Sequence, residues 1–172
     1  IDINCDCGES FGNWPMGADD QIMPLITTAN VACGFHGGDP LVMRNTVAFA
    51  AENGVAVGAH PGLPDLAGFG RRKMDISPDD AYAMVVYQVG ALKGFLEARG
   101  MTLHHVKPHG ALYLMLHDQE EVAAAVAEAI RDTCPVPLLY WPAPVEMHAL
   151  PRAARKLGIE VVGEVYFDLG YS

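Results

Sequence analysis

Short apolar runs alternate with longer amphipathic stretches along the whole sequence. Six runs have the length and side-chain pattern of strands, and they occupy residues 1–6, 30–35, 55–60, 104–108, 137–141 and 160–166. Helical spacing of apolar residues is found at residues 18–27, 40–53, 77–99, 110–118, 119–132 and 145–157. The run 55–60 is apolar on both faces, which is typical of a parallel strand covered by helices. The alternation therefore predicts an α/β domain built on a parallel sheet.

Capping residues mark the ends of two of the predicted helices. Asp39 followed by Pro40 is a typical helix start, and Gly54 follows the last helical residue of that segment. Ser77 similarly begins the longest predicted helix, and Gly100 ends it. The local signals therefore agree with the periodicity.

This order of elements predicts a deformed TIM-like βα barrel that occupies residues 1–172 as one domain. A closed barrel of this kind needs eight strands, and we count six. Phe167 and Tyr171 would also need covering by further structure. We therefore expect the barrel to be incomplete at its C-terminal end in this chain, because the chain is truncated or because something outside it completes the fold.

Composition excludes several classes of function. The net charge of −10 disfavours nucleic acid and anionic membranes as partners, because both require clustered Lys and Arg. No apolar run approaches the roughly 20 residues of a membrane helix. The four cysteines lack the spacing of zinc fingers and redox motifs, which suits buried free thiols in a reducing cytoplasm. We expect a cytoplasmic protein.

Residues capable of chemistry follow five of the predicted strands. They are Asp6, Glu9, His36, His60, Lys107, His109, Glu164 and Asp168. Because the carboxyl ends of parallel strands meet at one edge, we expect these side chains to form a single site there. The pattern predicts an enzyme.

The first three strand ends allow more than one chemistry. Asp6 and Glu9 could divide their roles, with one carboxyl raised in pKa as an acid and the other ionised as a base or metal ligand. His36 and His60 occupy equivalent positions after successive strands. They could bind a divalent ion together with Asp6, or one could be a general base without a metal.

Cations lie near the later strand ends. Period-two alternation places His105, Lys107 and His109 on one face, so Lys107 could stabilise an oxyanion or bind phosphate beside an acid or base at His109. Arg71 and Arg72 belong to a basic segment that could be a solvated turn or could bind an anionic substrate. The sequence contains no G-x-x-x-x-G-K-[ST] phosphate loop.

The same segments resemble the LamB/YcsF lactam-utilisation family. The matching motifs are DINCDCGES (residues 2–10), ANVACGFHGGDP (29–40), VGAHPGLPD (57–65), GFGRR (68–72), YQVGAL (87–92) and VKPHGALY (106–113). The resemblance covers essentially the whole chain. Two departures are Cys7, where the family has leucine, and residues 169–172, after which the family pattern continues with strands that would close the barrel.

The resemblance implies a 5-oxoprolinase activity, the ATP-dependent opening of the lactam ring of 5-oxo-L-proline to L-glutamate. It also implies two partner subunits, B and C, and ATP accompanied by Mg²⁺. The family's motif positions carry over onto Asp6, Glu9, His36, His60, Lys107 and His109. We do not expect a tightly bound transition metal.

From these observations we assign expected roles. The predicted catalytic residues are Asp6, Glu9, His60, Lys107 and His109, and the predicted substrate-binding residues are His36, Asp39, Arg71 and Arg72. Two alternatives remain open at this stage. One is a metal-dependent amide hydrolase or deacetylase with Asp6, His36 and His60 as ligands, and the other is a substrate-binding subunit whose catalysis is carried out by its partners.

Overall fold

The computed structural model describes residues 1–166, and Asp168, one of the predicted strand-end acids, lies outside them. Its five named strands are β1 (Asn4–Cys7), β2 (Thr28–Ala32), β3 (Ala56–His60), β4 (Leu138–Pro142) and β5 (Glu160–Glu164). Its helices are α1 (Asp19–Ile22), α2 (Pro40–Asn53), α3 (Pro78–Glu97), α4 (Gly110–Met115), α5 (Glu120–Thr133) and α6 (Ala149–Lys156). Two short 3₁₀ turns are η1 (Met23–Leu25) and η2 (Val145–Met147). The predicted alternation is confirmed.

All the strand pairings are parallel and follow the order of the chain. β1 pairs with β2 and β2 with β3, while β4 pairs with β5. The predicted strand 104–108 connects the two halves, although only Val106 forms bridges, one to Ala59 and one to Leu139. The N–H of Lys107 donates to the carbonyl of Ala59, and the N–H of Tyr140 donates to that of Val106. One extended segment therefore completes a continuous parallel sheet.

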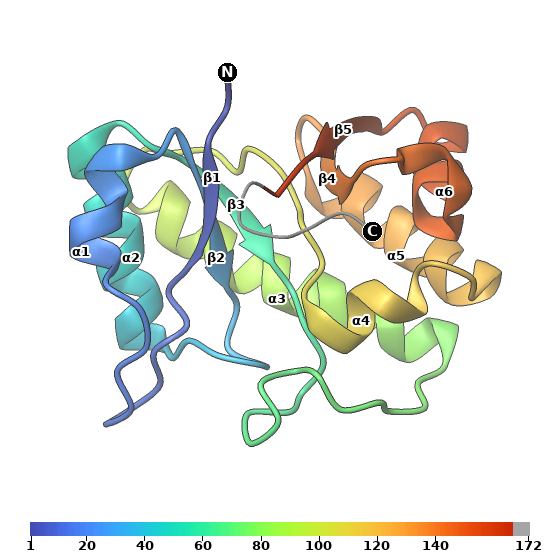
Figure 1. The fold of residues 1–172 in the computed structure, drawn as a ribbon, viewed down its shortest axis with the longest axis horizontal. Helices are drawn as coiled ribbons and strands as arrows, with labels where there is room; N and C mark the ends of the chain where they lie inside the picture. Colours follow the sequence, from blue (N-terminus) through green and yellow to red (C-terminus); the bar gives the residue numbers. More distant parts are fainter. Residues whose placement is uncertain (167–172) are drawn as a thin grey trace.

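Side chains from the two ends of the sheet contact each other, which shows that the sheet is strongly curved. The Asn4 side-chain amide donates to Glu164 over 3.3 Å, and the Tyr140 hydroxyl donates to Asp2 over 2.8 Å. Figure 1 shows α1 and α2 on the left of the first three strands, α3 passing behind them, and α5 and α6 beside β4 and β5. These polar side chains, of Asp2, Asn4, Tyr140 and Glu164, therefore lie on the inner face of the curve, opposite the helices.

The helix boundaries follow from capping. Asp39 accepts hydrogen bonds from the N–H groups of Leu41 and Val42, and Gly54 ends α2 in the left-handed conformation with φ of 68°. Ser77 and Asp80 form a reciprocal capping box at the start of α3. These are the boundaries that the sequence predicts.

Several predicted helices and strands are shorter than expected, and three of them have a clear local cause. The helix predicted at 18–27 divides into α1 and η1 next to Pro24, whose ring supplies no N–H for a longer helix. The helix predicted at 145–157 divides into η2 and α6 because His148 has extended backbone angles. β2 ends at Ala32, before Gly34 turns the chain with φ of 94°.

The core lies between the outer face of the sheet and the helices. Strand residues such as Val31, Val57 and Leu139 are fully buried there, as are Leu92 and Leu96 of α3. α3 packs against α5, which in turn packs against α6. This packed layer of helices holds the strand ends in place. Within the described residues, no helix is long and apolar enough to cross a membrane.

Candidate active site

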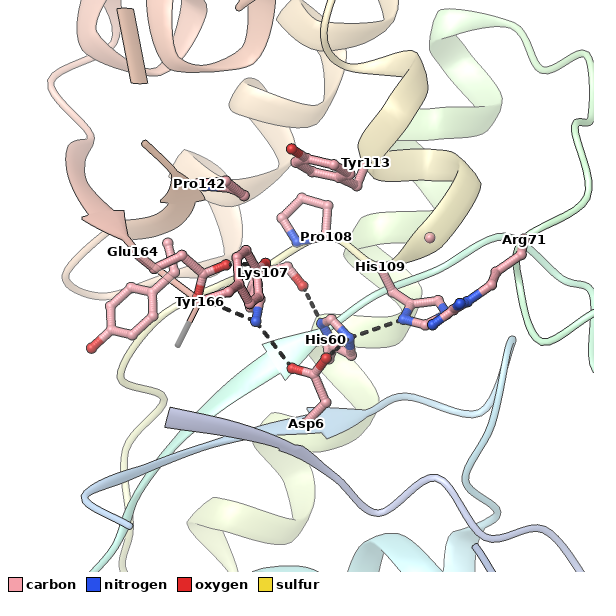
Figure 2. Close-up of a pocket in the computed structure, with 12 residues that line it drawn as sticks. Asp6, His60, Arg71, Lys107, Pro108, His109, Tyr113, Pro142, Glu164 and Tyr166 are labelled. Carbon is pink, nitrogen blue, oxygen red and sulfur yellow. Dashed lines mark hydrogen bonds and ion pairs between the residues drawn. The ribbon is translucent and has the colours of Figure 1, made fainter. Parts of the chain in front are cut away.

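A pocket of about 390 Å³ opens at the carboxyl ends of the strands (Figure 2). Its volume lies within the range of small-molecule sites. The lining residues are Asp6, His60, Arg71, Lys107, Pro108, His109, Gly110, Tyr113, Tyr140, Pro142, Glu164 and Tyr166. Four residues predicted as catalytic from the sequence therefore line one cavity.

Lys107 lies between two carboxylates. Its Nζ is 3.2 Å from Asp6 Oδ1 and 3.2 Å from Glu164 Oε2, and its side chain is only 8% exposed. Tyr166 donates its hydroxyl hydrogen to the other side of the Glu164 carboxylate over 2.6 Å. The ammonium of Lys107 also lies 5.5 Å from the centre of the Tyr166 ring. The pocket therefore contains one ammonium group that is held in place by ion pairs with two carboxylates.

Asp6 is held as an ionised carboxylate. Burial alone would raise its pKa, but the charges of His60 and Lys107 and a hydrogen bond from Asn30 lower that pKa far below the usual range. The Asn30 amide donates to Asp6 Oδ1 over 2.8 Å, and His60 Nε2 lies 3.4 Å from Asp6 Oδ2. At neutral pH Asp6 is therefore an ionised but weak base that can accept hydrogen bonds.

Glu9 has the opposite tendency. Burial is the largest influence and, with the nearby charge of Asp6, it raises the Glu9 pKa above its ordinary value despite the attraction of His60 and His109. Its Oε1 lies 3.2 Å from His36 Nε2 and 3.9 Å from His109 Nδ1. The two carboxyls of the first strand end therefore differ in their readiness to hold a proton.

Three histidine rings pack together next to Glu9. His36 stacks on His109 with 3.7 Å between ring centres, and His60 meets both rings edge-on. Burial lowers the pKa of His36 and of His109 to about 3, and neighbouring histidines add to the effect. His36 and His109 are consequently neutral at neutral pH. His36 Nδ1 has no hydrogen-bond partner among the described residues.

His60 and His109 are oriented by backbone carbonyls. His60 Nδ1 lies 2.6 Å from the carbonyl oxygen of Lys107, and His109 Nε2 lies 2.8 Å from that of Phe69. Their remaining nitrogens, His60 Nε2 and His109 Nδ1, face one another at 3.0 Å. The four side chains Glu9, His36, His60 and His109 each bring one potential metal-ligand atom into a group whose members lie within 4.8 Å of one another.

A chain of buried polar contacts supports the pocket from inside the sheet. His105 Nε2 lies 2.6 Å from Asn30 Oδ1, and the Asn30 amide reaches both Asn4 and Asp6. This path exists because Gly58 has no side chain: a Cβ there would lie 2.3 Å from the His105 ring. Polar residues at positions 2, 4 and 6 form a period-two pattern in which Asn4 is expected to support local structure, whereas nothing in the sequence singles out Asn30 for this role.

Two residues predicted to bind substrate have other partners. Asp39 caps α2 and also accepts the N–H of Gly12 over 2.8 Å, so it does not line the pocket. Arg72 pairs with the buried carboxylate of Asp65, to which its Nε donates over 2.8 Å. Arg71, by contrast, lines the pocket. His36 is not among the lining residues and packs against His109.

The four cysteines are free thiols, as expected, with Cys7, Cys33 and Cys134 buried and Cys5 half-buried. Burial raises the pKa of the Cys33 thiol to about 12. Cys33 therefore behaves as a small apolar residue rather than as a nucleophile.

Proteins of known name are similar to this chain over nearly its whole length. The chain is 56% identical over 171 residues to a Tolumonas auensis protein that is named as the A subunit of 5-oxoprolinase, covering 99% of this chain and 67% of that protein. It is 53% identical to the protein of the same name from Bacillus subtilis, covering 99% of this chain and 65% of the relative. The chain thus spans about two thirds of the length of these relatives.

A solved structure has the same fold. The crystal structure of a lactam utilization protein from Thermus thermophilus matches with a TM-score of 0.91 and 50% identity, covering 96% of this chain and 66% of that one. The model of the LamB/YcsF family matches residues 1–172. The family model covers every residue of the sequence, and the solved structure agrees with it in fold and in sequence identity. The chain therefore belongs to the LamB/YcsF family.

Proposed function

We propose that this chain is the A subunit of a 5-oxoprolinase, which opens the lactam ring of 5-oxo-L-proline to give L-glutamate with hydrolysis of ATP. The observation that carries the proposal is the identity of 53–56% to relatives named as the A subunit of this enzyme, over 99% of this chain. The polar strand-end pocket supports it, because its size and charges suit a small acid with an amide.

The complete activity requires partners and ATP. The word subunit in the relatives' names supports a complex, and we propose subunits B and C as the other members. Because the sequence has no phosphate loop, we assign the ATP site, with its Mg²⁺, to unconventional residues here or to a partner. The four free cysteines support a cytoplasmic location. The chain-ordered, curved parallel sheet supports its being part of a deformed TIM-like barrel.

Ring opening needs a nucleophile, a stabilised oxyanion and a proton for the departing nitrogen. Water adds to the lactam carbon, the bond from that carbon to nitrogen breaks, and the nitrogen gains a proton. Asp6, kept ionised by its neighbours, is proposed to hold the attacking water by a hydrogen bond, and His60 beside it is the proposed base that takes the proton. The Lys107 ammonium is the proposed donor to the developing oxyanion, because it is fixed in the pocket by two carboxylates.

The sequence allows His109 to act as an acid or a base. Its pKa of about 3 makes it a neutral base at neutral pH, so it is not proposed as the proton donor. Glu9, whose pKa is raised by burial, is the alternative proposed acid, although it contacts His36 and does not line the pocket itself. His60 and His109 would then orient water and substrate through the nitrogens that face each other.

ATP solves a problem of reactivity. The lactam amide is stabilised by resonance, so water attacks it slowly. Transfer of a phosphoryl group from ATP to the lactam oxygen would make the carbon a better electrophile. Water then adds, the carbon–nitrogen bond breaks to leave an acyl phosphate, and a second water releases phosphate and L-glutamate. Lys107 and Arg71 would neutralise the phosphoryl charge. Arg72 is left out of this role because Asp65 holds it.

The test is an ATP- and 5-oxo-L-proline-dependent assay of L-glutamate, run on the chain assembled with subunits B and C. Replacing Lys107 by Ala is expected to lower turnover at least about 10²-fold, which is typical of losing one oxyanion-stabilising group. Lys93→Ala is the matched control, because Lys93 contacts the carbonyl of Thr133 on the helical layer. Full turnover by the Lys107→Ala complex would remove the lysine from the mechanism.

One observation favours a second candidate, a metal-dependent amide hydrolase or deacetylase. The cluster of Glu9, His36, His60 and His109 has the residue types of a metal site, although the ligand set differs from the Asp6, His36 and His60 expected from sequence. This candidate predicts amide hydrolysis without ATP. The same assay without nucleotide therefore separates the two functions.

A further inference from the structure

Two cationic side chains line the pocket, and they differ in whether an acid already neutralises them. The Lys107 ammonium forms ion pairs with Asp6 and Glu164, each at 3.2 Å. Among residues 1–166, no carboxylate forms an ion pair with Arg71. A substrate group with a permanent negative charge is therefore attracted to Arg71, because at Lys107 it would lie beside two carboxylates.

The backbone next to Arg71 is fixed against the start of α4. The N–H of Ala111 donates to the carbonyl of Gly70 over 2.8 Å. Gly110 allows this contact because it lacks a side chain, since a Cβ there would lie 2.6 Å from the Gly70 carbonyl oxygen. The Arg71 guanidinium carbon lies 5.6 Å from the centre of the Phe69 ring. The side chain of Arg71 therefore extends from a fixed point on the pocket wall.

The N–H groups of the Arg71 guanidinium are available to a ligand. Within the described residues, these groups form no hydrogen bond to another side chain or to the backbone. A guanidinium is planar, and its N–H groups match the two oxygens of a carboxylate in a pair of parallel hydrogen bonds. Arg71 thus has the chemistry of a carboxylate-binding residue.

The rest of the pocket has a polar side and an apolar side (Figure 2). In this view the groups that lie between Lys107 and Arg71 are Asp6, His60 and His109. Above them lie three side chains with apolar ring faces, Pro108, Tyr113 and Pro142. The two cations therefore stand at opposite ends of a pocket whose two sides differ in polarity.

A five-membered lactam acid matches this arrangement. In 5-oxo-L-proline the ring nitrogen is bonded both to the carbon that carries the carboxylate and to the carbonyl carbon, and two methylene groups complete the ring. With the carboxylate at Arg71 and the carbonyl at Lys107, the nitrogen faces His60 and His109. The methylene groups then face the apolar side. Contacts at both ends would fix the position and the direction of the ring.

We infer that Arg71 binds the carboxylate of the substrate and makes the pocket selective for lactams that carry a carboxylate beside the ring nitrogen. The inference rests on the proposed function for the reaction itself, and it adds the group by which the substrate is distinguished from neutral lactams. With Arg71 occupied by the carboxylate, the charge of the phosphoryl group would be left to Lys107. Arg72 is not an equivalent cation, because it is paired with Asp65.

The test compares two ligands that differ in the carboxylate. 2-Pyrrolidinone is the same lactam ring as 5-oxo-L-proline without that group. Calorimetric titration of the chain assembled with subunits B and C, in the absence of ATP, measures both affinities. The wild-type complex should bind 2-pyrrolidinone at least about tenfold more weakly than 5-oxo-L-proline, because the analogue leaves Arg71 without its partner.

Variants of Arg71 separate recognition of the carboxylate from a structural role. Arg71→Met should weaken binding of 5-oxo-L-proline at least about tenfold and leave the binding of 2-pyrrolidinone unchanged. Arg71→Lys keeps the charge without the planar pair of N–H groups and should recover part of the affinity. Arg44→Met is the matched control, because Arg44 is exposed on α2 and outside the pocket. Circular dichroism checks that each variant is folded.

Each outcome has a distinct meaning. Equal affinity of Arg71→Met and Arg44→Met for 5-oxo-L-proline, an equal loss for both ligands in Arg71→Met, or no binding of 5-oxo-L-proline by the wild-type complex would overturn the inference. The expected binding pattern without any L-glutamate formation would support the carboxylate site and count against the proposed function alone. L-Glutamate formation with the same KM in Arg71→Met and wild type would support the function and overturn the role of Arg71.

Discussion

The ammonium of Lys107 lies 3.2 Å from the Asp6 carboxylate, although 101 positions separate the two residues in the sequence. The contact joins the end of β1 to the extended segment that links β3 and β4. Glu164, at the end of β5, holds the other side of the same ammonium. One lysine thus ties the first strand of the sheet to the last.

This contact predicts the outcome of a double-mutant cycle. Lys107→Met leaves Asp6 and Glu164 facing each other without a cation, and removing one partner of a fully buried ion pair typically costs about 3–5 kcal/mol. We expect a smaller loss here because the Asp6 side chain is 38% exposed. Adding Glu164→Gln should recover part of that loss. Urea unfolding of both single variants and the double variant measures the coupling, and simple additivity would contradict it.

Stability should depend on pH through His105. Burial, with the charge of His104, lowers the His105 pKa to about 3, whereas an unfolded histidine titrates near pH 6.5. As the pH falls from 6.5 towards 3, the unfolded chain binds a proton that the folded chain refuses, so stability present above pH 6.5 is progressively lost. The loss from this histidine is at most about 2 kcal/mol at pH 5.

The matched variant is His105→Gln, which cannot titrate. The difference in free energy of unfolding between wild type and His105→Gln should therefore shrink when the pH is lowered from 7.5 to 5. Chemical denaturation at the two pH values measures it. A difference that stays constant would show that His105 is protonated equally in the folded and unfolded chains.

Gly58 should not tolerate a side chain. A Cβ at this position would lie 2.3 Å from the His105 ring, so Gly58→Ala must displace His105 from Asn30 at a cost of about 1–3 kcal/mol. The control is Gly94→Ala in α3, where a Cβ would meet nothing within 4 Å and should stabilise the helix by about 0.4–1 kcal/mol. Thermal unfolding of both variants tests the contrast, which equal stabilities would contradict.

Arg71 and Arg72 should respond differently to replacement by alanine. Arg71 lines the pocket, so Arg71→Ala is expected to raise the KM for substrate while the unfolding temperature stays the same. Arg72 holds the buried Asp65, so Arg72→Ala is expected to lower the unfolding temperature and to alter KM less. Parallel kinetics and thermal unfolding check the pair, and a reversed pattern would show that Arg72 is the residue that meets the substrate.

Much of the fold follows from the sequence because periodicity and capping are local properties. Asp39 and Gly54 bound α2 in the structure as the sequence predicts. The predicted strand 104–108 runs between β3 and β4, although only Val106 forms bridges. The convergence of Asp6, His60, Lys107 and His109 on one pocket also follows, since parallel strands place their carboxyl ends on one edge.

The individual partners could not be predicted, because they depend on the curvature of the sheet and on competing contacts. Nothing in the sequence says that Asp65 captures Arg72 while Arg71 lines the pocket. The pKa of His109 likewise depends on its stacking against His36, a contact between segments more than seventy residues apart. The positions of the strand ends identify the candidate site residues. Tertiary packing then determines the pKa values of these residues and the groups that they contact.

The most direct test of the proposed function is L-glutamate formation from 5-oxo-L-proline and ATP by the complex that carries Asp6→Asn. This change keeps the size of the side chain but removes the carboxylate that Lys107 and His60 hold ionised. We predict a fall in turnover of at least about 10²-fold, on the order of the loss of one electrostatic group at the reacting centre, with the complex still assembled. Wild-type turnover by the assembled Asp6→Asn complex would contradict the central claim that this pocket opens the lactam ring.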